Sequence, residues 1–149
     1  MIPSISWEEL ATLRLSDFVP AKLIRELQDW EFMDRLWVGE ATGFTEWLRL
    51  ADDPEVLRSM ALDLVGLESG TVDAILKRLG LPLHPAMTRD QLKSTLGEPA
   101  SVKVFPGAKE RETLTYPAPP SGGYRLSCTV QKTAGLTYLV VMRGDVTGL

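Results

Sequence analysis

The alternating pattern after Pro99 limits the possible folds of this chain more than any other sequence feature. In the run 123–131 every second residue from Tyr124 to Val130 is apolar, and the residues between them are polar. Because successive side chains of a β-strand point to opposite faces, this pattern predicts an antiparallel strand with one buried and one solvated face. The runs 101–106, 111–117 and 136–143 also have the composition of strands. We therefore expect a four-stranded antiparallel sheet, with the last run, which is apolar on both faces, in its interior.

The connections between these strands differ in composition. Lys132-Thr-Ala-Gly135 is typical of a hairpin loop in which the glycine supplies a positive φ. The segment 117–123, Pro-Ala-Pro-Pro-Ser-Gly-Gly, contains too much proline for a tight two-residue turn. It is either a loop that forms a binding edge or an ordinary surface connection.

The start of the chain contains residues that are typical of helix N-termini. The residues Ser6-Trp-Glu-Glu9 have the Ser-x-x-Glu form of a capping box, which predicts a short helix over about 7–14. Pro20 suits the first turn of a helix, because its missing N–H would be unpaired there in any case. After it, apolar residues recur at spacings of three, four and seven, so a helix is predicted over 20–38.

Two more helices are expected before residue 67. Asp53-Pro54 combines a cap with a first-turn proline, and the apolar spacing after it predicts a helix over about 54–65 that Gly66 ends. The stretch 44–50 lies between the two long patterns and is predicted as a short helix.

A short internal repeat follows. The run Thr71–Pro82 can be laid over Thr88–Pro99 at an offset of 17, and Thr, Asp, Leu, Gly and Pro coincide. Each copy has the pattern of a short helix with threonine as N-cap and glycine as C-cap. The repeat is either a duplication or the shared punctuation of two unrelated helices.

Together these patterns predict an α+β fold. An N-terminal helical cluster is followed by a helix packed on a four-stranded antiparallel sheet. The boundary falls between a helical region at 1–83 and a sheet region at 84–149, and the two are expected to form one compact unit.

Composition and charge restrict the classes of function. The chain has 149 residues, of which 44% are hydrophobic and 24% charged, as in ordinary globular proteins. It contains no apolar run of membrane-spanning length and no secretion signal at its start, so a cytoplasmic location without membrane association is expected. The net charge of −4 disfavours nucleic acid as a partner. Residues 1–68 hold 6 Lys/Arg and 14 Asp/Glu (net −8), whereas 69–149 hold 10 and 6 (net +4).

The run 86–99, Ala-Met-Thr-Arg-Asp-Gln-Leu-Lys-Ser-Thr-Leu-Gly-Glu-Pro, resembles a known signature. It is similar to the Gly-Met-Thr-x-x-x-Val-x-x-x-Leu-Gly-x-Pro motif of the SmpA/OmlA-type small envelope lipoproteins and the related β-lactamase-inhibitor-protein fold. Ala86 and Leu92 depart from it, and we expect neither the signal peptide nor the lipidated cysteine of those lipoproteins in this chain. The resemblance covers residues 84–143 and implies a sheet that docks other proteins.

Few residues of the chain suit catalysis. His84 is the only histidine and Cys128 the only cysteine, so neither a metal-ligating cluster nor a disulfide is expected. We expect Cys128 to pack inward on its strand, where burial disfavours a thiolate. Nucleophile elbows, phosphate-binding glycine loops and paired carboxylates with suitable spacing are not found. The sequence therefore predicts a protein that is not an enzyme and needs no cofactor or metal.

Aromatic residues crowd into the acidic part of the chain. Trp7 and Trp47 stand at predicted element ends beside Glu8 and Glu46. Tryptophan rimmed by carboxylates is typical of a protein-binding hot spot for a basic partner, although core packing explains both tryptophans equally well.

Two hypotheses of different classes follow. The first is a non-enzymatic protein-binding protein, either an immunity protein that inhibits a toxin or a chaperone of an effector, with partner contacts at Trp7, Glu8, Glu46 and Trp47. The alternative is a small-molecule sensing or catalytic domain with its pocket between helices and sheet. In that case the polar groups of the pocket would be His84, Tyr116, Tyr124 and Arg125.

Overall fold

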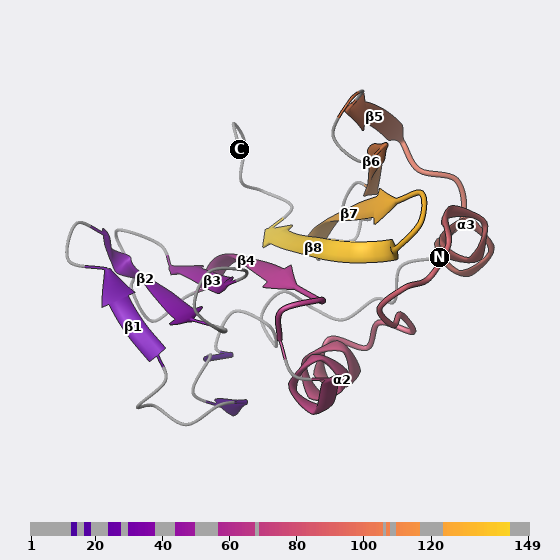
Figure 1. Cartoon of the computed structure of the whole chain (residues 1–149). Coiled ribbons are helices and arrows are strands. Elements are labelled where there is room, and N and C mark those ends of the chain that lie inside the picture. The colour runs from indigo at the N-terminus through magenta and orange to yellow at the C-terminus, as the bar shows by residue number, and fades with distance from the viewer. Residues whose placement is uncertain are drawn as a thin grey trace.

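A computed structural model describes most of the second half of the chain and parts of the first (Figure 1). The described residues are 13–14, 17–18, 24–27, 30–37, 44–49, 57–67, 69–105, 107, 110–116 and 124–143, with the backbone alone for 24–27, 30–37, 44–49 and 143.

An antiparallel sheet dominates the described part of the chain. Eight strands follow the order β1-β2-β3-β4-β8-β7-β6-β5, and every neighbouring pair is antiparallel. The strands are β1 (Ile24–Leu27), β2 (Trp30–Trp37), β3 (Phe44–Arg49), β4 (Leu57–Asp63), β5 (Ser101–Phe105), β6 (Arg111–Tyr116), β7 (Tyr124–Gln131) and β8 (Gly135–Arg143). The described residues also form two helices, α2 (Ser69–Arg78) and α3 (Arg89–Leu96).

The predicted α+β fold with an N-terminal helical cluster is wrong. Strands β1 and β2 lie where one helix was expected over 20–38, and β3 replaces the short helix at 44–50. Strand β4 lies within the predicted helix at 54–65 and pairs with β8. The sheet is therefore larger than four strands, with β4-β8-β7-β6-β5 as a five-stranded antiparallel unit and more strand than helix overall. The helix predicted over 7–14 lies outside the described residues except for its last two positions.

The burial pattern of β4 explains why the apolar spacing of this segment was interpreted as a helix. Its buried residues are Leu57, Met60 and Leu62, and the turn after it buries Leu64. A helix would bury 57, 60 and 64 on one face, whereas a strand from Met60 onward buries 60, 62 and 64. The two patterns share most of their residues, so pairing with β8 and β3 decides between them.

The later strands agree with the sequence patterns. Strands β5 to β8 start and end within one or two residues of the predicted runs. Residues of β7 alternate between buried and half-buried along the whole strand. The interior position predicted for β8 is confirmed, because it lies between β4 and β7.

Both predicted helices in the repeat are present, although only one has the predicted N-cap. Thr88 caps α3 through a full capping box: its hydroxyl accepts from the Gln91 N–H, and the Gln91 side chain accepts from the Thr88 N–H. Helix α2 begins at Ser69, so Thr71 lies in its first turn and is not an N-cap. Within the described part of the chain, neither helix has the length and apolar character needed to cross a bilayer.

The helices pack on one face of the sheet, which we call the inner face. A row of apolar residues crosses this face at matching register positions: Leu62, Leu139, Cys128, Leu114 and Val102. The first four of these are buried in one cluster with Leu92 and Leu96 of α3 and with Val72, Ile75 and Leu76 of α2. The opposite, outer face of β6 and β7 is half-buried and rich in hydroxyl groups.

A close backbone contact fixes the start of α3 against the sheet. The Ala86 N–H donates to the Leu136 carbonyl at 3.1 Å, and the Leu136 N–H donates to the Met87 carbonyl at 2.8 Å. Gly135 has φ 74°, and a Cβ placed there would lie 2.4 Å from the Ala86 oxygen. Glycine is therefore required at this position by both conformation and space.

Candidate functional site

Strand β5 forms one end of the sheet. It pairs with β6 and with no other strand among the described residues. The first four of its five residues are exposed, and Phe105 is half-buried. An edge strand directs alternate N–H and C=O groups away from the sheet, where they can pair with a strand from another chain. In Figure 1, β5 lies at the upper right border of the sheet, beyond β6.

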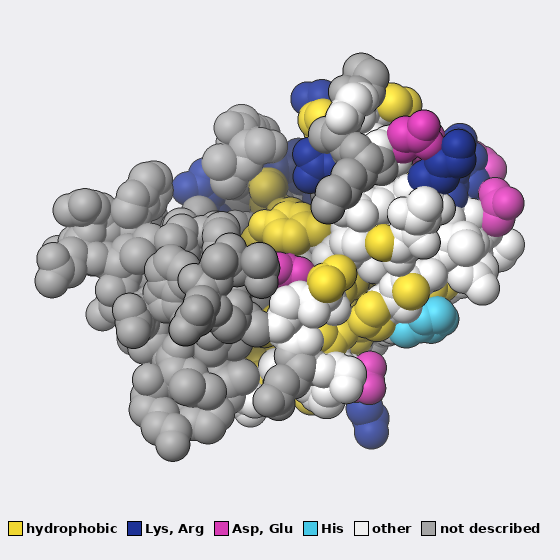
Figure 2. All heavy atoms as spheres, viewed as in Figure 1, with side chains coloured by type: hydrophobic (Ala, Val, Ile, Leu, Met, Phe, Trp, Pro, Cys, Tyr) yellow, Lys and Arg dark blue, Asp and Glu magenta, His cyan; other side chains and the backbone are white. Residues whose placement is uncertain are grey.

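The inner side of β5 is apolar and uncovered. Val102 and Val104 are 41% and 57% exposed, whereas Leu114, the register partner of Val102, is fully buried. Figure 2 shows hydrophobic side chains beside Lys and Arg at the top of the molecule, where Figure 1 places β5. The apolar row of the inner face therefore continues past the helices onto the edge strand.

The outer side of β5 carries an aromatic ring flanked by cations. The Lys103 Nζ lies 5.0 Å from the centre of the Phe105 ring, and the Arg111 guanidinium carbon lies 5.8 Å from it. Arg111 is the register partner of Phe105 on β6, so the three side chains gather on one face. Among the described residues, neither cation forms an ion pair with a carboxylate. We call these three residues the cationic cluster.

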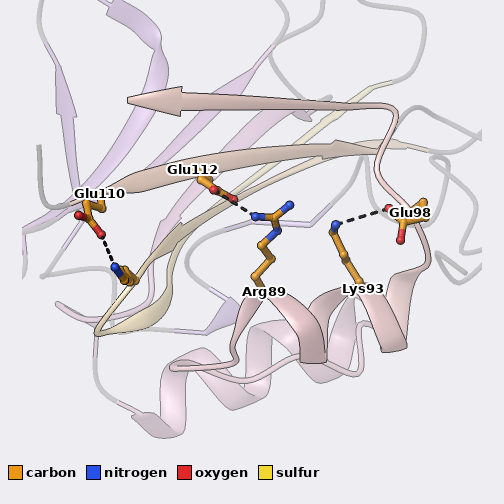
Figure 3. A network of polar contacts seen from close by, with 6 residues as sticks. Arg89, Lys93, Glu98, Glu110 and Glu112 are labelled. Carbon is orange, nitrogen blue, oxygen red and sulfur yellow. Dashed lines mark hydrogen bonds and ion pairs between the residues drawn. The ribbon is translucent and has the colours of Figure 1, made fainter. Parts of the chain in front are cut away.

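A hollow of about 500 Å³ lies on the inner side, between the start of α3, strand β6 and the β7–β8 turn. Two ion pairs border it: Arg89 Nη1 lies 3.2 Å from Glu112 Oε1, and Lys132 Nζ lies 3.1 Å from Glu110 Oε2 (Figure 3). The second oxygen of Glu112 is buried without a hydrogen-bond partner. Since the cations already neutralise two carboxylates here, the hollow carries little net charge.

Helix α3 turns its charged side toward β5 and β6. Figure 3 shows Arg89 and Lys93 extending from α3 toward the strands, with Lys93 Nζ 3.6 Å from Glu98 Oε2. Glu98 is highly exposed, so this pair is of the kind that contributes little stability. The three described ion pairs therefore all lie on the inner side, away from the cationic cluster.

Two residues with unusual backbone conformation line the hollow between α3, β6 and the β7–β8 turn. Ala86 has φ 69° and Glu110 has φ 48°, and they are the only non-glycine residues with positive φ in the described part of the chain. Left-handed conformation costs an L-residue roughly 1–2 kcal/mol. Ala86 occupies the position at which the SmpA/OmlA signature has glycine, the residue that adopts this conformation without strain.

A second hollow of about 380 Å³ lies on the outer face of the sheet. Asp63, Arg111, Thr129 and Tyr138 are among its lining residues. A bulge between Thr129 and Val130 leaves Thr137 as an extra residue on β8, and its hydroxyl donates to the Thr129 carbonyl at 3.5 Å. No group of three or more metal-ligating side chains occurs among the described residues.

Of the four predicted partner-binding residues, the structure describes only the backbone of two. Trp7 and Glu8 lie outside the described residues. Glu46 and Trp47 lie in β3, where their register partners on β4 are Ala61 and Met60. Successive positions of a strand fall on opposite faces, so these two positions do not share a face.

The four residues predicted to line a ligand pocket are also separated. Tyr116 is buried on β6, and its hydroxyl donates to the Gly97 carbonyl at 3.0 Å. Tyr124 is buried on the inner face and its hydroxyl has no hydrogen-bond partner, whereas Arg125 lies on the outer face and donates to Met142 Sδ. His84 is exposed between the helices, and its Nδ1 donates to the Pro85 carbonyl. None of the four lines either hollow.

Burial shifts the acidity of the inward-facing groups. It raises the pKa of Cys128 from 9.0 to about 12 and that of Tyr124 from 10.0 to about 12. The pKa of Tyr116 also rises to about 12, chiefly through burial. Because Cys128 stays a thiol at neutral pH, it is not poised as a nucleophile, in line with its predicted inward position.

The sequence reasoning missed the β5 edge as a site. The strand itself was predicted, and its sequence, Ser-Val-Lys-Val-Phe, places both valines on one side and Lys103 and Phe105 on the other. A lysine in the middle of a short strand is a known mark of an edge. The strand order that makes β5 an edge, however, depends on pairing that the sequence pattern does not contain.

Comparison with known proteins found no match among protein-family models, curated proteins or solved structures. The resemblance to SmpA/OmlA-type proteins therefore stays a prediction.

Proposed function

We propose that this chain is a non-enzymatic protein-binding protein that accepts an extended segment of its partner along the open edge of β5. The observation that carries the proposal is the pair of exposed valines, Val102 and Val104, on an edge strand with no neighbour on its far side among the described residues. Such an edge supports strand addition, in which main-chain hydrogen bonds supply affinity and side-chain contacts supply specificity.

The energetics of the edge favour this mode of binding. An added strand would satisfy the outward N–H and C=O groups of β5 and cover both valines. Complete burial of a valine side chain contributes about 1.5–3 kcal/mol, and a large part of each side chain is still exposed here. The first hollow lies beside this edge, with Glu112 of β6 bordering it opposite Val104.

Within this function, two versions are carried forward from the sequence: an immunity protein that inhibits a toxin, and a chaperone of an effector. Both act by occupying a surface of another protein, so an open sheet edge suits either. A cytoplasmic location is part of the proposal, and the single, buried thiol of Cys128 is compatible with a reducing compartment.

The test is site-specific crosslinking in cells of the source organism. A photoreactive benzoylphenylalanine replaces the exposed Ser101 at the edge, and a matched control places it at the exposed Asp73 in α2. We expect a crosslinked partner from position 101 and none from position 73. The yield of this crosslinked partner should fall at least tenfold with Val104→Glu. It should be unchanged with Val65→Glu, which adds the same charge at a 70% exposed valine outside β5.

The crosslinking results have a clear opposite outcome. Equal crosslinking from both positions would place the docking surface elsewhere. So would unchanged crosslinking with Val104→Glu, provided that this variant is folded and as stable as the unmodified protein.

A further inference from the structure

We propose that the segment docked on β5 is an acidic strand, in which carboxylate side chains alternate with small apolar ones. Its carboxylates would lie over Lys103 and the adjacent cationic cluster, and its apolar side chains over Val102 and Val104. This inference rests on the proposed function and adds the chemistry of the partner to it.

The two faces of β5 determine the alternation. Val102 and Val104 lie on the inner side of the strand, and Lys103 and Phe105 lie on the outer side. A strand that pairs with β5 must also present successive side chains to alternate faces. Its inner side chains therefore meet valine, and its outer side chains meet lysine and phenylalanine.

The charge balance selects acidic side chains for the outer side. Lys103 and Arg111 face the Phe105 ring and form no ion pair with any described carboxylate. The cations on the inner side are different, because Arg89, Lys93 and Lys132 each have a glutamate partner. Around β5 and β6, the described cations without an ion pair thus lie on the outer side of the edge, where a carboxylate of the partner is attracted.

The same charges argue against a second copy of this chain as the occupant. In a symmetric antiparallel pairing of β5 with β5 of another molecule, Lys103 of both copies would lie on one face of the joined sheet. Like charges on facing strands are unfavourable. Lysine on an edge strand is a usual means by which proteins avoid such pairing.

The test measures binding of soluble nine-residue peptides to the full chain by fluorescence anisotropy and by amide chemical shifts. One peptide alternates glutamate with valine, a second replaces glutamate by glutamine, a third replaces it by lysine, and a fourth contains the glutamates and valines in two blocks. We expect the first peptide to bind at least tenfold more tightly than the third and fourth, with shifts centred on 101–105. Higher salt should lower the affinity of the first peptide, because exposed charges are screened.

A charge reversal provides the decisive control. Lys103→Glu should invert the preference between the glutamate and lysine peptides, whereas Lys77→Glu, which changes an exposed residue of α2, should leave it unchanged. Equal affinity for the glutamate, glutamine and lysine peptides would overturn the acidic pattern. Shifts outside β5, or a concentration-dependent dimer that Val104→Glu dissociates, would overturn the assignment of the occupant.

The two proposals fail in different ways. If crosslinking from Ser101 identifies a partner but the peptides show no acidic preference, protein docking at β5 stands and its proposed chemistry falls. If position 101 yields no crosslink, the docking function itself fails, whatever the peptides show.

Discussion

The centre of the sheet and its β5 edge carry similar side chains on the inner face, yet their surroundings differ. Leu139, Cys128 and Leu114 are fully buried in the central strands, whereas Val102, the next position in the same row, is 41% exposed. The residue types differ little along the row. What changes is the cover above them, so the same apolar chemistry stabilises the fold at the centre and is available for binding at the edge.

The cover changes because α3 is amphipathic. Leu92 and Leu96 of α3 join the central cluster, while Arg89 and Lys93 extend toward β6 and the turn at Glu98. The buried cluster that α3 joins therefore ends before β5, whose two valines stay exposed. Three measurements distinguish the centre from the edge.

The largest effect is expected at the centre. Leu114→Ala removes a fully buried side chain and leaves a cavity, so the free energy of unfolding should fall by about 2–5 kcal/mol. Urea unfolding followed by circular dichroism measures this. A loss below about 1 kcal/mol would mean that the central row is packed no more tightly than the edge.

A pH effect of intermediate size should come from the buried acids. The raised pKa values of Cys128 and the two tyrosines mean that these groups ionise in the unfolded chain before they ionise in the folded protein. Their contribution to stability is therefore complete below about pH 9 and is lost as pH rises toward 12. The slope should reach about 1.4 kcal/mol per pH unit for each group.

Urea unfolding between pH 8 and 11 under reducing conditions tests this dependence. Cys128→Ala removes the group with the lowest unfolded pKa, so the decline should begin nearer pH 10, where tyrosine ionises, than pH 9. A stability that stays constant up to pH 11 would show that these side chains are solvated.

The smallest effect is expected at the edge. Val102→Ala shortens an exposed side chain directly opposite Leu114 in the register, and stability should change by about 0.5 kcal/mol or less. Crosslinking of the partner from Ser101 should nevertheless weaken. A large loss of stability from this variant would mean that Val102 belongs to the core and is not a docking residue.

Prediction from the sequence succeeded where local chemistry is sufficient. Thr88 and Gln91 cap α3 through bonds within one turn of chain, and Gly135 has the positive φ expected for its loop. The alternation along β7 is equally local. Prediction failed for the segments that form β1 to β4, where the spacing of apolar residues in β2 and β4 fits a helix and a strand alike.

The candidate site also combines features that the local sequence determines with features that only tertiary structure determines. The alternation of Val102 and Val104 with Lys103 was readable from the sequence, but the exposure of both valines was not. Tyr124 and Arg125, two of the four residues predicted for a ligand pocket, lie on opposite faces because they are neighbours on one strand.

The sequence by itself thus determined the N-cap of α3, the β7–β8 turn and the alternation along β7, because each depends on interactions between residues close in the chain. Tertiary structure decided that residues 57–63 form a strand, since their partners on β8 lie 75 to 83 positions later. It also decided that β5 ends the sheet and that both of its valines lie outside the buried cluster. Such features depend on which elements pack side by side, and the free energy of that packing is shared among distant residues, so no local pattern encodes it.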